Sequence, residues 1–251
     1  MTIKFWLEFS LLFAASLVGG AAVLPYGLRL LQGAAQKKPL KMSVPMLLLL
    51  SFLQSAVLFA IATAAGLLAA HAIGLGAPYI ETVLPGNGSA QAVLPMLQVS
   101  IMFGILAGAM LLVADLLFLP YWPKVLLDTA RKTTLWENFA ASFYGGINEE
   151  VLMRLFGLSA LAWLLSGIWH TSGGRPTDAV FWVANVLMAI LFGIGHLPAL
   201  KSLLGRISPL MLARSLLLIG HQYAVCWQEW KRLLEVLWPP ASAPIRLWDA
   251  P

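Results

Sequence analysis

The most regular feature of the sequence is a series of long apolar stretches separated by short polar connections. An α-helix of about 20 apolar residues spans the hydrocarbon core of a bilayer, which is roughly 30 Å thick. Five stretches reach this length, namely Phe5–Leu24, Val44–Ala70, Ala92–Leu117, Phe139–Ile168 and Ala179–Leu200. A sixth could begin near Ile207, although its apolar character fades after Gly220. The pattern predicts an all-α, polytopic transmembrane bundle of five to six spans.

The composition agrees with this fold class. Hydrophobic residues make up 60% of the 251 residues and charged residues 11%, against roughly 45–50% and about 25% in soluble domains. These values exclude an intrinsically disordered chain, a coiled coil and an ordinary soluble enzyme. The single cysteine, Cys226, excludes an intramolecular disulfide framework and a multi-cysteine metal site. The net charge of +5 is typical of basic cytoplasmic loops, so we expect membrane lipid and not nucleic acid as a partner.

The connections between the spans are alternately basic and poor in basic residues, with Arg175 as the single basic residue of Thr171–Asp178. The basic ones contain Lys37, Lys38 and Lys41, then Lys124, Arg131 and Lys132, then Lys201 and Arg206. The connection Gly74–Gln91 contains no Lys or Arg. Because basic loops stay in the cytoplasm, we expect Gly74–Gln91 and the N-terminus outside. We expect a multi-pass integral protein of a bacterial inner membrane, with Tyr121–Trp136 as an amphipathic segment at the membrane surface.

The fourth predicted span contains three ionisable residues within six positions, Glu149, Glu150 and Arg154. Each costs on the order of 2.5–3.5 kcal/mol inside a membrane, so such residues usually have a function. Glu150 and Arg154 are four residues apart and can pair on one face of an α-helix. Glu149 would lie about 100° around that helix, outside the pair. A glutamate in an apolar site can act as a general base near neutral pH.

The fifth predicted span has a polar and aromatic stripe. Phe192 and His196 are four residues apart, and Asn185 lies three helical turns before His196 on the same face. Pro198 is expected to end or bend the helix. Span four starts and span five ends at the cytoplasmic side, so Glu149 and His196 can lie at the same depth. We expect them to face one another in a polar pocket that opens toward the cytoplasm.

Two pairs of glycines would allow another backbone or a substrate to approach closely. Gly104 and Gly108 form a G-x-x-x-G pattern in the third span, although glycine is common in such helices. Gly193 and Gly195 flank the residue two positions before His196.

The residues alone leave other interpretations open. The three charges of span four could form an inert ion-pair network that locks two helices. His196 could be a satisfied residue at a helix end. A proton-coupled transporter could use Glu149, Glu150 and His196 as a relay, although the sequence has no visible internal repeat.

The two motifs, Glu149-Glu150-x-x-x-Arg154 and Phe192-x-x-x-His196, resemble the E-E-x-x-x-R and F-x-x-x-H motifs of the CPBP family. This family includes the CAAX prenyl endopeptidases and the bacterial Abi, bacteriocin-processing proteins. The resemblance covers about Trp136–Arg214, in two successive predicted spans.

The resemblance implies an intramembrane endopeptidase that cleaves membrane-associated peptides or proteins. It implies that Glu149 activates a water with His196 as its partner, and that Glu150, Arg154, Phe192 and Asn185 support them. The family has been described as metalloproteases. However, one glutamate and one histidine are too few ligands for a closed zinc site and the chain has no H-E-x-x-H, so we expect no cofactor.

One family motif is missing. The family carries H-x-x-x-N or H-x-x-x-D on a later helix, and none of the four histidines here has Asn or Asp four residues later. Polar residues interrupt any span after His221, as if the chain were truncated or frame-shifted after Leu218. We therefore divide the chain into N-terminal transmembrane helices (1–120), a partial protease-like core (121–220) and an irregular tail (221–251). The alternative function is a catalytically impaired pseudoprotease or a bacteriocin-immunity-type membrane protein.

Overall fold

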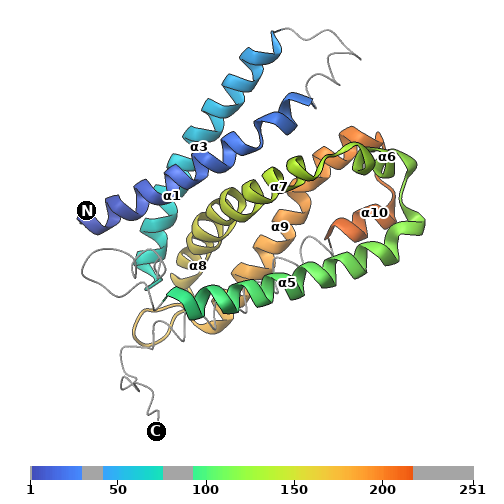
Figure 1. Ribbon diagram of the computed structural model, residues 1–251. Coiled ribbons are helices and arrows are strands. Elements are labelled where there is room, and N and C mark those ends of the chain that lie inside the picture. Colours follow the sequence, from blue (N-terminus) through green and yellow to red (C-terminus); the bar gives the residue numbers. More distant parts are fainter. Residues whose placement is uncertain (1, 30–41, 76–92, 217–251) are drawn as a thin grey trace. The chain divides into compact units, whose positions relative to one another are not determined.

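The computed structural model describes residues 2–29, 42–75 and 93–216, which form helices and connecting turns with one β-bridge between His170 and Pro176 (Figure 1). The all-α class is thereby confirmed. The chain folds as two compact units that interleave along the sequence. Unit 1 contains Met1–Gly76 and Pro123–Ala184, and unit 2 contains Ala77–Trp122 and Asn185–Pro251. The predicted boundaries after residues 120 and 220 divide the chain differently and stay predictions.

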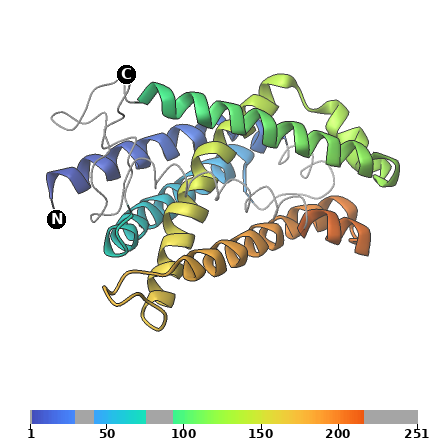
Figure 2. The same ribbon diagram turned by 90° about the horizontal axis from the view of Figure 1, so that it is seen from below.

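Unit 1 is built around a long helix that passes two others. Its helices are α1 (Ile3–Ala22), α3 (Val44–Ala72), α6 (Lys124–Lys132), α7 (Leu135–Tyr144), η3 (Gly145–Leu158) and α8 (Ser159–Ser166). The last three follow one another without a break and make one long helical rod. α1 and α3 contact each other, and η3 packs against both (Figure 2). The motif Glu149-Glu150-x-x-x-Arg154 of the fourth predicted span therefore lies on a helix that packs against both α1 and α3.

Unit 2 contains α5 (Val93–Phe118), the short η2 (Leu119–Tyr121), most of α9 (Asp178–Leu204) and α10 (Pro209–Arg214). One basic side chain connects α10 to α5. Arg214 of α10 forms an ion pair with Asp115 of α5, and its guanidinium lies 4.7 Å from the ring centroid of Trp122. The pair explains how a charge near the end of the third predicted span is satisfied.

Four helices of the described ranges are long and apolar enough to cross a membrane. They are Ile3–Arg29, Val44–Ala72, Ser100–Tyr121 and Asp178–Ser202, and they correspond to the first, second, third and fifth predicted spans. The fourth predicted span corresponds to the rod of α7, η3 and α8. These apolar helices support an integral membrane protein.

Some sequence predictions fall on parts that the structure does not describe. The connections at residues 37–41 and 76–91 belong to these parts, so the predicted orientation stays a prediction. The sixth predicted span is represented by α10, and its continuation beyond residue 216 lies outside the described residues.

Pro198 was predicted to end or bend the fifth helix, and it does not end it, because α9 continues through Pro198 to Leu204. A bend at this residue stays a prediction. Proline removes one backbone N–H from a helix, and helices of membrane proteins tolerate this loss where local adjustment satisfies the carbonyl that is left over. The residue therefore lies inside the helix and does not mark its end.

The backbone of η3 approaches α3 closely at Gly66. A Cβ atom built on Gly66 would lie only 2.8 Å from both the carbonyl carbon and the carbonyl oxygen of Leu155. By contrast, nothing in the described part of the chain lies within 4 Å of a Cβ built on Gly104 or Gly108. Among the described residues, the G-x-x-x-G pattern of Gly104 and Gly108 thus makes no close helix contact, whereas the isolated Gly66 does.

A buried carboxylate near the beginning of α1 contacts the last turn of α3. Glu8 is fully buried, its Oε2 lies 3.2 Å from Nε2 of His71, and its Oε1 lies 4.0 Å from Nζ of Lys4. The buried ring of Phe5 packs edge-to-face on the His71 ring. The sequence analysis assigned no role to Glu8 or His71, although a single acidic residue in an apolar span is a signal for such a pair.

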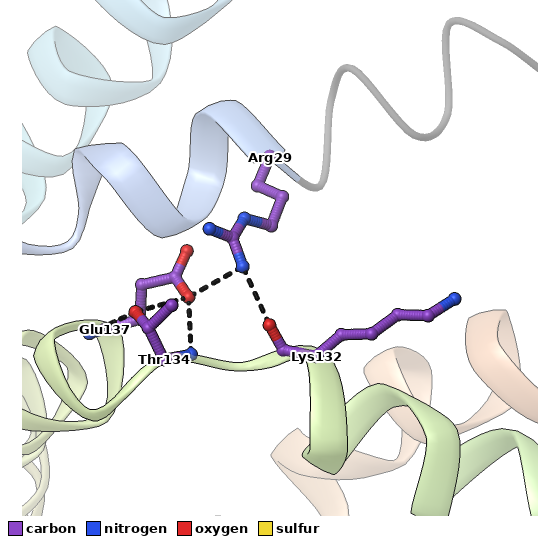
Figure 3. A network of polar contacts seen from close by, with 4 residues as sticks. All are labelled: Arg29, Lys132, Thr134 and Glu137. Carbon is purple, nitrogen blue, oxygen red and sulfur yellow. Dashed lines mark hydrogen bonds and ion pairs between the residues drawn. The ribbon is translucent and has the colours of Figure 1, made fainter.

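The start of α7 is fixed by a polar network (Figure 3). Thr134 and Glu137 form a capping box, in which the Glu137 amide donates to the Thr134 hydroxyl and the Thr134 amide donates to Oε2 of Glu137 over 2.9 Å. Nη1 of Arg29, in the helical turn 24–29 after α1, lies 2.8 Å from Oε2 of Glu137 and donates to the carbonyl of Lys132. The network attaches the end of the first span to the beginning of the rod.

The Gly66 contact predicts a specific loss of stability. Gly66→Ala should lower the free energy of unfolding by about 1–3 kcal/mol, because the added methyl group meets backbone atoms that cannot turn away. Denaturant titration of the purified protein in detergent measures this difference. Gly108→Ala, with open space around its Cβ, is the matched control and should be neutral. Equal stability of the two variants would contradict the close contact of α3 with η3.

The Glu137 network predicts a dependence of stability on pH. The hydrogen bond from the Thr134 amide, the hydrogen bond from the Thr134 hydroxyl and the charge of Arg29 hold the pKa of Glu137 below its usual value of 4.5, against the opposing effect of burial. This contribution is fully present above the unfolded pKa and is lost as the pH falls through the lower folded pKa. Glu137→Gln should therefore flatten the decrease of the melting temperature below about pH 4.5. Asp128→Asn, at an exposed carboxylate, should leave the wild-type curve unchanged.

Candidate active site

The predicted general base lies on a π-helix. In η3 the backbone hydrogen bonds reach back five residues, as from the Ser159 amide to the Arg154 carbonyl. The sequence analysis assumed an α-helix here, so its angle of 100° between Glu149 and Glu150 does not apply to this wider helix. Such helices are rare and occur frequently at functional sites.

The second glutamate pairs as predicted. Oε2 of Glu150 lies 2.6 Å from Nη1 of Arg154, four residues further along η3. The Arg154 side chain is 12% exposed and that of Glu150 is 36% exposed. Glu150 therefore has a charge partner on its own helix.

The first glutamate turns back along η3 toward its beginning. Its Oε2 lies 3.5 Å from the position that a Cβ on Gly145 would occupy. The next residue, Gly146, has nothing within 4 Å of a Cβ position among the described atoms. The carboxylate of Glu149 therefore lies beside Gly145, where no side chain stands between it and the helix backbone.

Two neighbours of Glu149 were missed by the sequence analysis. Asn148 is fully buried and its Nδ2 donates to the carbonyl oxygen of Ser16 on α1 over 2.9 Å. Tyr144, whose ring packs edge-to-face on Phe59 of α3, lies within electrostatic range of the Glu149 carboxylate. A polar residue directly before the two glutamates was the available signal for Asn148.

The predicted partner, His196, is oriented by its own helix. Its Nδ1 lies 2.9 Å from the carbonyl oxygen of Phe192, and the two rings form an edge-to-face contact with centroids 4.6 Å apart. A carbonyl oxygen only accepts, so Nδ1 of His196 is the donor of this hydrogen bond. At Gly193 a neighbouring backbone approaches as expected, with the Ser215 oxygen 3.3 Å from the Cβ position, whereas the Cβ position of Gly195 is open.

Asn185 shares the face of His196 but not its immediate surroundings. Eleven residues of helix separate the two by about 16 Å, at 1.5 Å per residue. Asn185 is fully buried, and neither atom of its carboxamide has a hydrogen-bond partner in the described residues. Asn185 therefore cannot contact the same atom as His196.

The two halves of the predicted pair belong to different units. Glu149 lies in unit 1, whereas Asn185, Phe192 and His196 lie in unit 2. The approach of Glu149 to His196 and the opening of their pocket toward the cytoplasm stay predictions.

The donor set of the site does not match a closed zinc site. Glu149 and His196 supply two ligands, and a structural or catalytic zinc uses three or four protein ligands. Within the described ranges no three His, Cys, Asp or Glu side chains come together to form a metal site. No step of the chemistry below depends on a metal.

The comparisons with known proteins agree with the motifs. Residues 131–241 match the family model of Rce1-like proteins, described as type II CAAX prenyl endopeptidase Rce1-like. The matched range includes all six residues of the predicted site and confirms the resemblance for this part of the chain. It points to a CAAX-type protease of the membrane. The match also continues past Leu218, the position where the sequence changes character. Comparisons with curated proteins and with solved structures found no match.

The ion pair of η3 predicts a measurable coupling. Arg154→Met should lower the free energy of unfolding by about 1–3 kcal/mol because Glu150 loses its cation. This is less than the roughly 3–5 kcal/mol of a fully buried pair, since Glu150 is partly exposed. The double variant Glu150→Gln/Arg154→Met should lose less than the sum of the two single changes. Strict additivity in denaturant titrations would show that the pair contributes nothing.

Proposed function

We propose that this protein is an intramembrane endopeptidase that hydrolyses peptide bonds with a water activated by Glu149. The observation that carries the proposal is the position of the Glu149 carboxylate beside Gly145, within the range that matches the protease family. A carboxylate in an apolar helical environment that a water can reach is suited to general-base catalysis.

In the proposed reaction, Glu149 removes a proton from a water molecule. The water oxygen forms a bond to the carbonyl carbon of the scissile peptide, which passes through a tetrahedral intermediate. The carbon–nitrogen bond then breaks, and Glu149 returns the proton to the leaving amine. Nε2 of His196 accepts a hydrogen bond from the same water or from the protonated Glu149, an arrangement that the bond from Nδ1 to Phe192 supports.

The other residues support this pair. Arg154 neutralises Glu150 and so leaves Glu149 as the base. Phe192 holds the ring of His196 by an edge-to-face contact. Asn185 is buried on α9, eleven residues before His196, and supports the helix that carries His196 without contacting the reacting atoms. The proposed mechanism uses no cofactor and no metal, although the family has been described as metalloproteases.

The proposed substrates are membrane-associated peptides or proteins that reach the site from the cytoplasmic half of the bilayer. The protein would act as a multi-pass component of a bacterial inner membrane, in contact with lipid and without a nucleic-acid partner. Prenylated CAAX peptides serve as test substrates only. They are not proposed as native substrates, because bacteria are not expected to use them.

A second candidate is a catalytically impaired pseudoprotease or a bacteriocin-immunity-type membrane protein of the Abi group. The observation in its favour is the absence of Asn or Asp four residues after any histidine of the chain. The resemblance implies that this missing motif supplies donors to the oxyanion of the intermediate, and loss of one such donor typically reduces kcat by about 100–1,000-fold. Such a protein would retain the folded site and bind a peptide without cleaving it.

Substitution of the base tests the first candidate. Glu149→Gln should reduce cleavage by about 100–10,000-fold with little change in stability, because the amide keeps the shape and loses the base. Cleavage is measured in liposomes with two quenched fluorescent peptides, one farnesylated with a CAAX end and one bearing a saturated acyl anchor. His196→Gln should cause a loss of the same order.

Two controls make the result specific. Asp128→Asn, at an exposed carboxylate of α6, should cleave like wild type. Treatment with EDTA should also leave cleavage unchanged if no metal takes part. Wild-type cleavage by Glu149→Gln would refute the assigned base. Binding of both peptides without cleavage by the wild-type protein would favour the pseudoprotease.

A further inference from the structure

We infer that Asn148 is a positioning residue for Glu149, fixing the π-helix η3 against α1 through a gap that Gly19 leaves open. The inference rests on the proposed function, since it assigns Asn148 a role in the reaction of Glu149. Asn148 acts through its neighbour and is not placed in contact with a substrate.

Three observations within unit 1 define the anchor. Asn148 is 0% exposed, and its Nδ2 donates to the Ser16 carbonyl oxygen over 2.9 Å. Its Oδ1 would lie only 2.0 Å from a Cβ atom on Gly19, so the carboxamide occupies the space where any other residue would carry a side chain. The Ser16 hydroxyl donates to the carbonyl of Leu12 within α1, so it does not compete for Asn148. These contacts therefore restrict both sliding of Asn148 along α1 and its rotation around the α1 axis.

The contact is unfavourable for stability alone. Oδ1 of Asn148 is buried and has no hydrogen-bond partner in the described residues. An unsatisfied buried polar group is destabilising, and an apolar residue of similar volume would avoid this effect. A buried polar group can instead select one register of two helices over others. We assign this role to Asn148.

The register of η3 against α1 matters because Glu149, the proposed base, directly follows Asn148. Asn148 and Glu149 share a peptide bond, so a rotation of η3 against α1 at Asn148 moves the Glu149 carboxylate relative to α1. The π-helix is a rare form that tertiary contacts must hold in place. A displacement of about 1 Å at a reacting group can reduce the rate by roughly 100-fold.

The first arm of the test measures cleavage of the farnesylated peptide. Asn148→Leu should reduce kcat by about 10–100-fold while KM and the melting temperature stay near wild type. Gly19→Ala should cause the same defect from the other side of the contact. In the background of Asn148→Ala, Gly19→Ala should add no further loss, because the clashing oxygen is gone. Gly20→Ala is the matched control, since its Cβ would meet only the Phe52 ring at 3.6 Å.

The second arm does not depend on cleavage. Dicyclohexylcarbodiimide labels protonated carboxyl groups in membranes, and mass spectrometry of peptides measures the labelling of Glu149 relative to that of Glu8. Asn148→Leu and Gly19→Ala should each change this ratio by at least about threefold, and Gly20→Ala should not change it. Such a change supports the anchor even if no variant cleaves, in which case only the proposed function fails.

An unchanged labelling ratio in both variants overturns the inference, whatever happens to cleavage. A loss of cleavage that follows only a loss of the folded fraction also overturns it, because Asn148 would then serve folding alone. A kcat of Asn148→Leu equal to that of the wild-type protein also overturns the inference.

Discussion

The structure of unit 1 depends on the close approach of η3 to α1 and α3 at two glycines. Helices in lipid gain little from the hydrophobic effect among themselves, so tight packing at small residues holds them together. Gly66 admits the backbone of η3 at Leu155, and Gly19 admits the carboxamide of Asn148. These contacts keep a helix with three charges inside the unit, where a position facing lipid would be costly.

The same constraint separates the roles of three consecutive residues. Asn148 reaches α1, Glu149 turns toward Gly145 at the beginning of its helix, and Glu150 pairs with Arg154 further along. In the proposed function, this run of adjacent polar residues provides an anchor, a base and the carboxylate that pairs with Arg154. None of the three assignments follows from residue type alone, because two of the residues are identical.

Much of the fold follows from the sequence because span length and apolar character are local properties. The Glu150–Arg154 pair was predicted for a similar reason, since a separation of four residues brings side chains together. The π-helix was not predicted, because the fourth span was placed on an α-helix with 3.6 residues per turn. Partner choice was also beyond the sequence: the spacing of Gly104 and Gly108 does not reveal that Gly66 makes the contact.

Other misses have the same origin. Glu8 and His71 lie on different helices and pair only after folding. Asn148 required knowledge of which helix passes Ser16. Pro198 was expected to end or bend α9, and whether a proline ends a helix depends on whether the surroundings satisfy the freed carbonyl.

The central claim is that Glu149 and His196 meet as one catalytic pair, and thiol cross-linking tests it most directly. In a Cys226→Ser background, Glu149→Cys/His196→Cys should be cross-linked by the shortest bifunctional thiol reagents. Glu149→Cys/Ile194→Cys should not be, because Ile194 lies about 200° around the same helix from His196. Equal cross-linking of both pairs, or none at His196, would contradict the account.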